Sequence, residues 1–347
     1  MFKAVFSQAA TWKKIIKSLT GFIETFEIKV NTKDGMKIEA FDGSHVAYVR
    51  VQLFSTEIES FYCKTPTVIG ISIKSLTKIM DLSNEHDVMA ISYGENEDTL
   101  NIQFDNPKKE KLTEIALKLI DINSDTTMAV PDYDHDIKIT MTSKELTSTL
   151  EKLKKCGEAV ELKVVNNNIV EVNDEDEKKE KKVEDKDIKH NNSIDNKEKT
   201  ITKKRDQPLH DNKKETTTAV KKKIKSSNRI EMKVIDDSSL TTLRLRERPF
   251  TDEKNKTYHV DSPPIIIESK INELSQTYSL KYLCMFAKAG SLSDLVHVFL
   301  KDNMPMKIRF DIDSVDLEGN EKASIGYIEF LLASKLSSDE EEKGNST

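Results

Sequence analysis

A histidine follows a tight polar turn early in the chain. Asp42-Gly43-Ser44 lies between two runs of alternating apolar and polar residues, and His45 opens the second run. Gly accepts positive φ, and Asp and Ser bond to nearby backbone, so the stretch predicts a turn between two strands. A catalytic His45 would need an orienting carboxylate and a nucleophile, which the local sequence does not supply. An ordinary solvent-exposed loop residue is the simplest alternative.

A second candidate for chemistry is the acidic stretch VPDYDHD. On an extended chain its alternate residues Asp132, Asp134 and Asp136 would share one side and could bind a metal ion. We favour a solvated linker that Pro131 stiffens. The sequence contains no GxGxxG, GxxxxGK[ST], GxSxG or HExxH motif. We therefore expect no enzyme, no cofactor and no metal.

Charge is concentrated in one segment. Of the 54 Lys+Arg and 60 Asp+Glu residues, 17 and 13 lie between Asn173 and Asn228, a stretch without Phe, Trp or Tyr. Such a segment cannot bury enough apolar surface to offset its ordering entropy, so we predict disorder. The remaining residues carry a net charge of −10. Any contact with nucleic acid must therefore use a local basic surface.

The cysteines and the apolar runs indicate the compartment. Cys63, Cys156 and Cys284 have no metal-binding spacing, and an odd, sparse set is typical of a reducing environment. No apolar run approaches the roughly 18 residues of a membrane span, and the start lacks the apolar core of a signal peptide. The sequence predicts a soluble intracellular protein that does not bind membranes.

The elements that would position these residues recur four times. Each unit is a strand, a short amphipathic helix and two strands joined by a turn. Ser7 and either Thr142 or Ser143 are predicted N-caps, and Gly157 a predicted C-cap. Four such units, two per half, predict an α+β fold of two similar domains with antiparallel sheets and paired helices. The helices are expected in VFSQAATWKKIIKSL, GISIKSLTKIMDL, IKITMTSKELTSTLEKLKKCG and YSLKYLCMFAKAG.

Every predicted helix carries lysine opposite its apolar side. On a negatively charged body, four such helices at repeat-related positions indicate one common basic surface, built from helices packed side by side. The helices lack aromatic interleaving and zinc-ligand spacing, so we expect contact with phosphates, independent of base sequence. The residues predicted to form this surface are Lys13, Lys14, Lys17, Lys78, Lys152, Lys155, Lys281 and Lys288.

Short stretches in the same order along both halves carry a resemblance. They are MFKAVFSQAATWKKIIKSL, FDGSHVAYVRV, YCKTPTVIGISIKSLTKIM, DTLNIQF, IALKLIDIN, CGEAVEL, YSLKYLCMFAKAGSLSDLV and IEFLLASKL. In them the chain resembles the sliding DNA clamps of the proliferating cell nuclear antigen family. The resemblance implies a DNA-clamp fold whose chains assemble head to tail into a ring of three, with helices lining the hole around double-stranded DNA.

The resemblance also implies the function. Clamps of this family are DNA polymerase processivity factors without enzymatic activity, and they hold DNA polymerase, the clamp loader and other replication and repair proteins on DNA. We expect a homotrimer in the nucleus, or at a cytoplasmic replication site if the protein is viral. One alternative is a checkpoint-type subunit that assembles with two different chains. Another is a viral processivity factor that binds DNA by an open basic surface, which the negative charge disfavours.

Partner proteins of this family insert a short peptide, with an aliphatic and two aromatic anchors, into a pocket under the linker between the domains. His45 would then be a wall of the pocket and neither acid nor base. Leu331 replaces the family's usual tyrosine, and Phe41 replaces a smaller residue, so the preferred anchors should differ. A purely core role for Phe41 and Leu331 is the alternative. The resemblance places the pocket at Phe41, His45, Tyr48, Met128, Val130, Pro305, Leu331 and Ala333.

The resemblance gives domain boundaries. The first domain is expected at 1–121, a connector at 122–133 and the second domain at 134–336, followed by an acidic tail at 337–347. The charged insert, 173–228, is expected at a hairpin tip, where a long insertion costs little loop entropy. NRIEMKVIDD would be the returning strand and LTTLRLRE the next, with NNIVEV as the alternative return. KLTEIALKLI and LTTLRLRE are the expected edge strands between neighbouring chains.

Overall fold

The computed structural model describes residues 1–95, 97–122, 132–166, 228–252, 257–315 and 321–335. These residues belong to one compact unit. The predicted insert up to residue 227, the acidic tail, and the pocket residues Met128 and Val130 lie outside the described residues. Among the helices described, none is long and apolar enough to cross a membrane.

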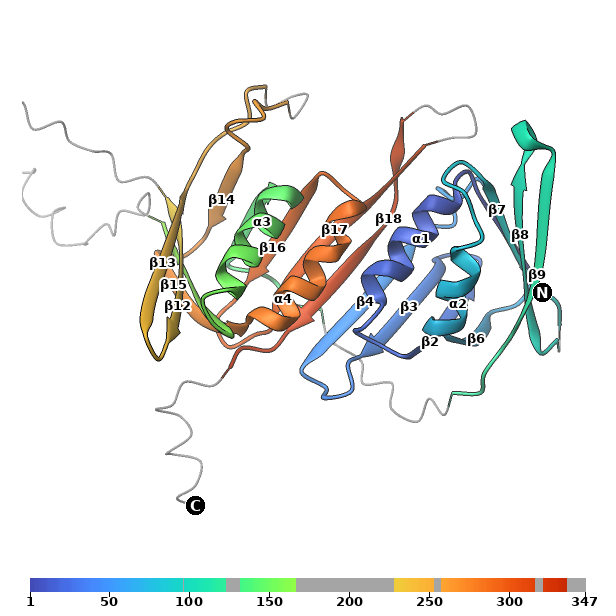
Figure 1. Ribbon diagram of the computed structural model, residues 1–347, viewed down its shortest axis with the longest axis horizontal. Helices are drawn as coiled ribbons and strands as arrows, with labels where there is room; N and C mark the ends of the chain where they lie inside the picture. Colours follow the sequence, from blue (N-terminus) through green and yellow to red (C-terminus); the bar gives the residue numbers. More distant parts are fainter. Residues whose placement is uncertain (96, 123–131, 167–227, 253–256, 316–320, 336–347) are drawn as a thin grey trace, which may run out of the picture. The chain divides into compact units, whose positions relative to one another are not determined.

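In the first half, each of two short helices follows one strand and precedes a pair of strands, as the repeat predicts, and further strands complete the half (Figure 1). Its elements are β1 (Phe2–Phe6), α1 (Ala9–Leu19), β2 (Thr25–Asn31), β3 (Gly35–Phe41), β4 (Ala47–Leu53), β5 (Ser60–Cys63), β6 (Thr67–Ser72), α2 (Ile73–Met80), β7 (Val88–Tyr93), β8 (Thr99–Asn106), the 3₁₀ turn η1 (Pro107–Lys109) and β9 (Lys111–Lys118).

The second half repeats this order with a longer final hairpin. Its elements are β10 (Ile137–Thr142), α3 (Ser143–Lys154), β11 (Ala159–Val165), β12 (Arg229–Asp236), β13 (Ser239–Arg246), β14 (Ile265–Ser269), β15 (Glu273–Ser279), α4 (Leu280–Phe286), the 3₁₀ helix η3 (Ala287–Ser291), β16 (Leu295–Leu300), β17 (Met306–Val315) and β18 (Glu321–Leu332).

Three antiparallel sheets are built from these strands. A nine-stranded sheet runs β14-β10-β16-β17-β18-β4-β3-β2-β6, so strands of both halves form one surface. A five-stranded sheet, β5-β1-β7-β8-β9, and a four-stranded sheet, β13-β12-β11-β15, complete the described strands. The predicted α+β class is confirmed, and β9 and β13 are edge strands, as expected.

The two halves join where β18 pairs with β4, in a register that runs from Gly326 opposite Leu53 to Leu332 opposite Ala47. A side chain at Gly326 would collide with the carbonyl of Gln52, so the close approach of the strands requires glycine there. On the helix side, the ring of Phe22 packs edge-on against Phe286 and Phe330, with centroids 5.8 and 6.1 Å away. The junction is therefore covered by aromatic packing.

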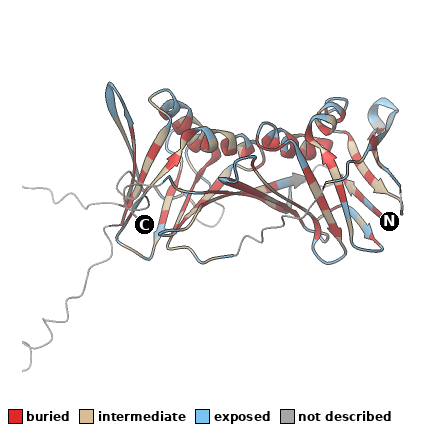
Figure 2. Ribbon diagram, turned by 90° about the horizontal axis from the view of Figure 1, so that it is seen from below, coloured by how far each residue is buried: buried red, intermediate tan, exposed pale blue. Residues whose placement is uncertain are grey.

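The helices cover one face of the nine-stranded sheet (Figures 1 and 2). Apolar residues three and four apart give α1 a buried side, formed by Trp12, Ile15, Ile16 and Leu19. Helix α1 packs against α2 and η3, and α3 packs against α4 and η3. Burial is concentrated between the helices and the strands, which leaves the polar side of each helix to solvent (Figure 2).

The hairpin that was expected to carry the insert follows the first predicted register. Strand β12 returns along β11, with Arg229 opposite Val165 and Lys233 opposite Glu161. Strand β13 then pairs along β12 and ends the sheet. NRIEMKVIDD is thus the returning strand, and the segment NNIVEV lies outside the described residues.

The helix caps follow the sequence only in part. Thr142 caps α3, because its hydroxyl accepts a bond from the backbone N–H of Glu145 at 3.3 Å. The prediction that Ser7 is the N-cap of α1 was wrong, because the Ser7 hydroxyl donates to Glu59 instead. The first backbone N–H of α1 donates to the carbonyl of Asp87 at 2.7 Å. Gly157 was also wrong as a C-cap, since α3 ends in a right-handed turn at Lys155.

Candidate functional site

The predicted basic residues lie on the helices that cover one face of the nine-stranded sheet. Seven of the eight are exposed, namely Lys14, Lys17, Lys78, Lys152, Lys155, Lys281 and Lys288. Lys13 is less exposed, and its ammonium is paired with Asp81 at 3.6 Å. This pairing reduces the charge that Lys13 can offer to a ligand.

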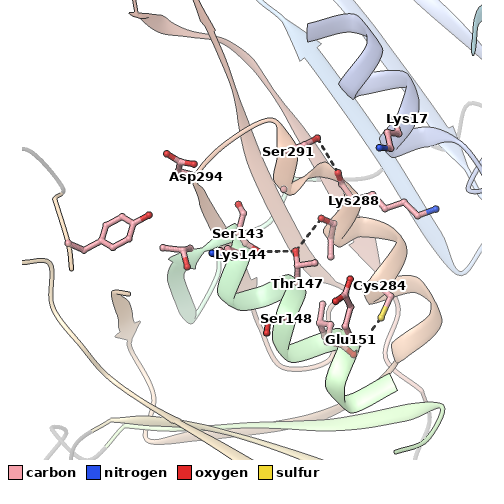
Figure 3. A pocket seen from close by; sticks show the side chains of 15 residues that line it. Lys17, Ser143, Lys144, Thr147, Ser148, Glu151, Cys284, Lys288, Ser291 and Asp294 are labelled. Atoms are coloured by element: carbon pink, nitrogen blue, oxygen red, sulfur yellow. Dashed lines mark hydrogen bonds between the residues drawn. The ribbon is translucent and has the colours of Figure 1, made fainter. Parts of the chain in front are cut away.

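A groove of about 680 Å³ brings two of these lysines together (Figure 3). Lys17 of α1 and Lys288 of η3 line it from one side, and Lys144 of α3 lines it from the other. Hydroxyl groups form much of its wall, and that of Thr147 donates to the carbonyl of Ser143 at 2.8 Å. Cations and hydroxyl groups provide several donors for an anion such as phosphate, and the carboxylates of Glu151 and Asp294 also line the groove.

A second groove, of about 990 Å³, lies between the end of α1 and the start of α2. Lys78 and Lys74 line it together with Phe41 and Gly43 of the polar turn. The sequence prediction therefore missed two exposed cations, Lys74 here and Lys144 in the first groove. Both lie on the polar sides of predicted helices, so the periodicity used for the other lysines should have included them. Lys152, Lys155 and Lys281 line neither groove.

The polar turn is held together by one carboxylate. Asp42 accepts bonds from the backbone N–H groups of Val46 at 2.9 Å and Ala47 at 2.8 Å, and from the hydroxyl of Ser44. The Tyr282 hydroxyl of α4 donates to it at 2.7 Å, which ties the turn to the second half. Burial raises the pKa of Asp42, but these bonds outweigh it and lower the pKa to about 2.

His45 is the last residue of this turn. Its N–H donates to the carbonyl of Asp42 at 3.0 Å, and its φ of 57° is in the left-handed region. Its side chain is exposed, and the imidazole lies 5.5 Å from the ring of Phe41. This geometry places the His45 imidazole beside the aromatic ring of Phe41.

The other predicted pocket residues gather at the same end of the sheet. Phe41, Tyr48 and Leu331 lie opposite one another on β3, β4 and β18, and therefore share one face. Tyr48 and Leu331 are only 4% and 5% exposed, so they form at most a floor, and the core role considered for Leu331 fits its burial. Ala333 donates its N–H to the Val46 carbonyl at 3.1 Å.

Pro305 completes this group. It precedes Met306, which pairs with Leu332 next to Leu331 and Ala333. The structure thus brings six of the eight predicted pocket residues to one end of the sheet, and the other two, Met128 and Val130, are not among the described residues.

A charged row crosses the sheet next to these apolar residues, on the same face. Glu39, Arg50, Glu329 and Arg309 lie opposite one another on β3, β4, β18 and β17. Arg50 contacts Glu39 at 3.2 Å and Glu329 at 3.6 Å, and Arg309 reaches Glu329 at 3.8 Å. The row therefore links the two halves by alternating charges.

The Glu39 carboxylate is the most strongly perturbed member of this row. Burial raises its pKa, but hydrogen bonds from Lys37 and from the Tyr48 hydroxyl, the latter at 2.6 Å, lower it to about 2. The same burial and contact raise the pKa of Tyr48 far above its usual range. Tyr48 is therefore a structural donor that links the apolar row to the charged row.

The acidic stretch before β10 does not assemble as a metal site. The Asp132 carboxylate pairs with Lys307 at 3.2 Å, while the backbone of Asp136 bonds to Leu300 and Lys270. Within the described ranges, no three His, Cys, Asp or Glu side chains are grouped so that they could hold a metal ion.

Comparison with known proteins gives consistent matches along the chain. The model of the proliferating cell nuclear antigen N-terminal domain matches residues 1–128, and that of the C-terminal domain matches residues 253–323. Proliferating cell nuclear antigen 1 of Plasmodium falciparum is 24% identical over 99% of this chain and 100% of its own length. The proliferating cell nuclear antigens of Chaetomium thermophilum and Dictyostelium discoideum are each 23% identical, over 98% and 97% of this chain and all of their own.

Proposed function

The chain belongs to the proliferating cell nuclear antigen family of sliding DNA clamps and DNA polymerase processivity factors, and we propose that its helix face is the surface that meets duplex DNA. The observation that carries this proposal is the row of exposed lysines on all four helices, on a protein with negative net charge. Exposed, flexible cations attract phosphates weakly and without base preference, and such attraction permits sliding.

We propose further that three copies close into a ring around the DNA. Edge strands β9 and β13 end two different sheets and leave backbone groups available for pairing. Leu112 at the start of β9 is 59% exposed, and Leu240 in β13 is 64% exposed. Antiparallel addition of β9 to β13 of the next copy would satisfy the backbone and cover these side chains. The proposed domain division, 1–121 and 134–336, places the edge strand β9 in the first domain and the edge strand β13 in the second.

The apolar row at Phe41, Tyr48 and Leu331, with His45, Pro305 and Ala333 around it, is the proposed docking surface for partner peptides. Its floor is apolar and its rim includes the exposed His45 and the half-buried Phe41. A glutamine-containing peptide with an aliphatic residue and paired aromatics would place its rings on this floor. DNA polymerase and a clamp loader are the proposed partners.

The nucleus is the proposed location. We propose no enzymatic activity for the chain itself.

Solution mass and retention on DNA test this function together. Light scattering of the purified full chain should give the mass of three copies. A loaded clamp should remain on nicked circular DNA and leave when the circle is linearised, because a ring is retained by topology. A single-chain mass with equal retention on linear and circular DNA would contradict the ring and favour an open basic surface. A trimer that forms only when two other chains are added would favour the checkpoint-type assembly.

A further inference from the structure

Lys307 of β17 occupies an unusual position on the outer face of the nine-stranded sheet, opposite the helices. Its side chain is only 15% exposed, and its ammonium contacts the Asp132 carboxylate at 3.2 Å. The same ammonium lies 5.3 Å from the ring centroid of Tyr133 and 5.9 Å from that of Phe299. One cation therefore touches two consecutive residues of the segment before β10 and one residue of β16.

Two further contacts fasten the same segment. The Tyr133 hydroxyl donates to the backbone carbonyl of Pro305, and burial raises the pKa of Tyr133 to about 12. His135 packs edge-on against Phe299, with ring centroids 4.8 Å apart. Residues 132–135 are thus attached to β17 by an ion pair and a cation–ring contact, to Pro305 by a hydrogen bond and to β16 by a ring contact.

The strand register places this attachment in line with the proposed docking surface. Phe299, Lys307, Leu331, Tyr48 and Phe41 lie opposite one another, in that order, on β16, β17, β18, β4 and β3. Residues opposite one another in an antiparallel sheet point to the same face. Lys307 therefore continues this row of residues beyond Leu331, and its ammonium contacts Asp132.

We propose that Lys307 is a positioning residue for peptide docking: it holds residues 132–133 against β16 and β17 and thereby fixes Pro305 and the end of the apolar row where a partner peptide binds. This inference rests on the proposed docking function of that row. Lys307 acts through Asp132 and Tyr133, because its ammonium is already paired with the Asp132 carboxylate at 3.2 Å and lies over the Tyr133 ring. A surface held in its binding geometry before the peptide arrives loses less entropy on binding.

A matched pair of variants separates this role from a general effect of charge. Lys307→Met keeps the length and the apolar stem but removes the ammonium. Lys138→Met is the control, because Lys138 lies in the same row on the other side of Phe299 and pairs with Glu268 at 3.1 Å. The probe is a synthetic peptide with glutamine, an aliphatic residue and paired aromatics, titrated calorimetrically into the full chain. We expect Lys307→Met to weaken binding by about five- to tenfold and Lys138→Met by less than about twofold.

Two measurements show whether Lys307 acts by positioning. Hydrogen exchange at residues 132–136 should become faster in Lys307→Met and in Asp132→Asn, with little change in melting temperature. The charge exchange Lys307→Glu with Asp132→Lys should restore slow exchange and most of the peptide affinity. Retention on nicked circular DNA should be unchanged in all of these variants, because the outer face does not meet the DNA.

The results distinguish failure of the inference from failure of the proposed function. If the unmodified chain does not bind the peptide, the docking function is wrong, and this inference falls with it whatever the exchange data show. If the chain binds the peptide and Lys307→Met binds it equally well, the positioning role alone is overturned. Weaker binding with unchanged exchange at residues 132–136 would also overturn it, because Lys307 would then contact the peptide directly.

Discussion

The two faces of the nine-stranded sheet use charge in opposite ways. On the helix face, Lys13 is the one predicted lysine with an ion-pair partner among the described residues, and the other seven extend into solvent. On the outer face, Glu39, Arg50 and Glu329 are largely withdrawn from water and paired across strands. Mobile charges suit a surface that must bind DNA without stopping on it, whereas fixed charges organise a surface with a defined shape.

The largest expected effect comes from removing the mobile charges. Lys17→Ala, Lys78→Ala and Lys288→Ala together should reduce retention on nicked circular DNA by at least about tenfold at moderate salt, because each phosphate contact adds to the affinity. The control with the same change of charge is Lys3→Ala, Lys33→Ala and Lys64→Ala, which are exposed but lie off the four helices. Equal retention by the two triple variants would show that the helix face is not the DNA surface.

The paired charges of the outer face should contribute to the stability of the fold. Arg50→Met leaves Glu329, which is 5% exposed, with Arg309 as its remaining cation at 3.8 Å. We expect a loss of about 3 kcal/mol in the free energy of unfolding, measured by urea denaturation. Arg309→Met should cost less, because Arg309 is farther from Glu329 and more exposed. A larger loss of unfolding free energy for Arg309→Met than for Arg50→Met would contradict this prediction.

The apolar row should carry most of the peptide affinity. Met128→Ala with Leu331→Ala should weaken binding of the partner-type peptide by on the order of 2 kcal/mol, as truncated anchors of an interface do. His45→Ala should cost less and leave the oligomeric state unchanged, since His45 lies at the rim. The affinity is measured by titration calorimetry. An unchanged affinity in the double variant would mean that the peptide does not dock at this end of the sheet.

Acidification should remove the stability that the ionised carboxylates of Glu39 and Asp42 contribute. Glu39 and Asp42 have folded pKa values lowered to about 2, below the unfolded values of about 4. Their contribution is therefore present above about pH 4 and is lost as the pH falls toward 2. Tyr48→Phe removes one donor to Glu39 and should cost about 1–2 kcal/mol at pH 7, and less at pH 2. An equal cost at both pH values, from urea denaturation, would mean that the ionised Glu39 is not what Tyr48 stabilises.

The sequence predicted features that one segment determines by itself. The amphipathic period of α1 and the residue types of the Asp42–His45 turn each involve only a few neighbouring residues. The helices and the turn could therefore be predicted from the local sequence. The edge positions of β9 and β13 came from the resemblance. Lys144 was missed although its position on α3 follows the same period as the other lysines.

Features that depend on strand pairing could not be predicted. Arg50 contacts Glu329 because β18 pairs with β4, and Lys307 contacts Asp132 because β16 lies between β10 and β17. No local pattern around Arg50 or Lys307 indicates a partner so distant in the sequence. Ser7 failed as a cap for a related reason, because a distant backbone carbonyl, that of Asp87, satisfied the helix instead.

The pairing of β18 with β4 has a consequence for how DNA enters a ring of such chains. Strand pairing along the junction, the phenylalanine cluster beneath it and the charged row above it hold the described strands of the two halves together. In the proposed ring, a joint between two chains would rest on a single pair of edge strands. Opening should therefore occur as a clean separation of β9 from β13, with each chain moving as a rigid arc, and a loader would have to break only that one seam.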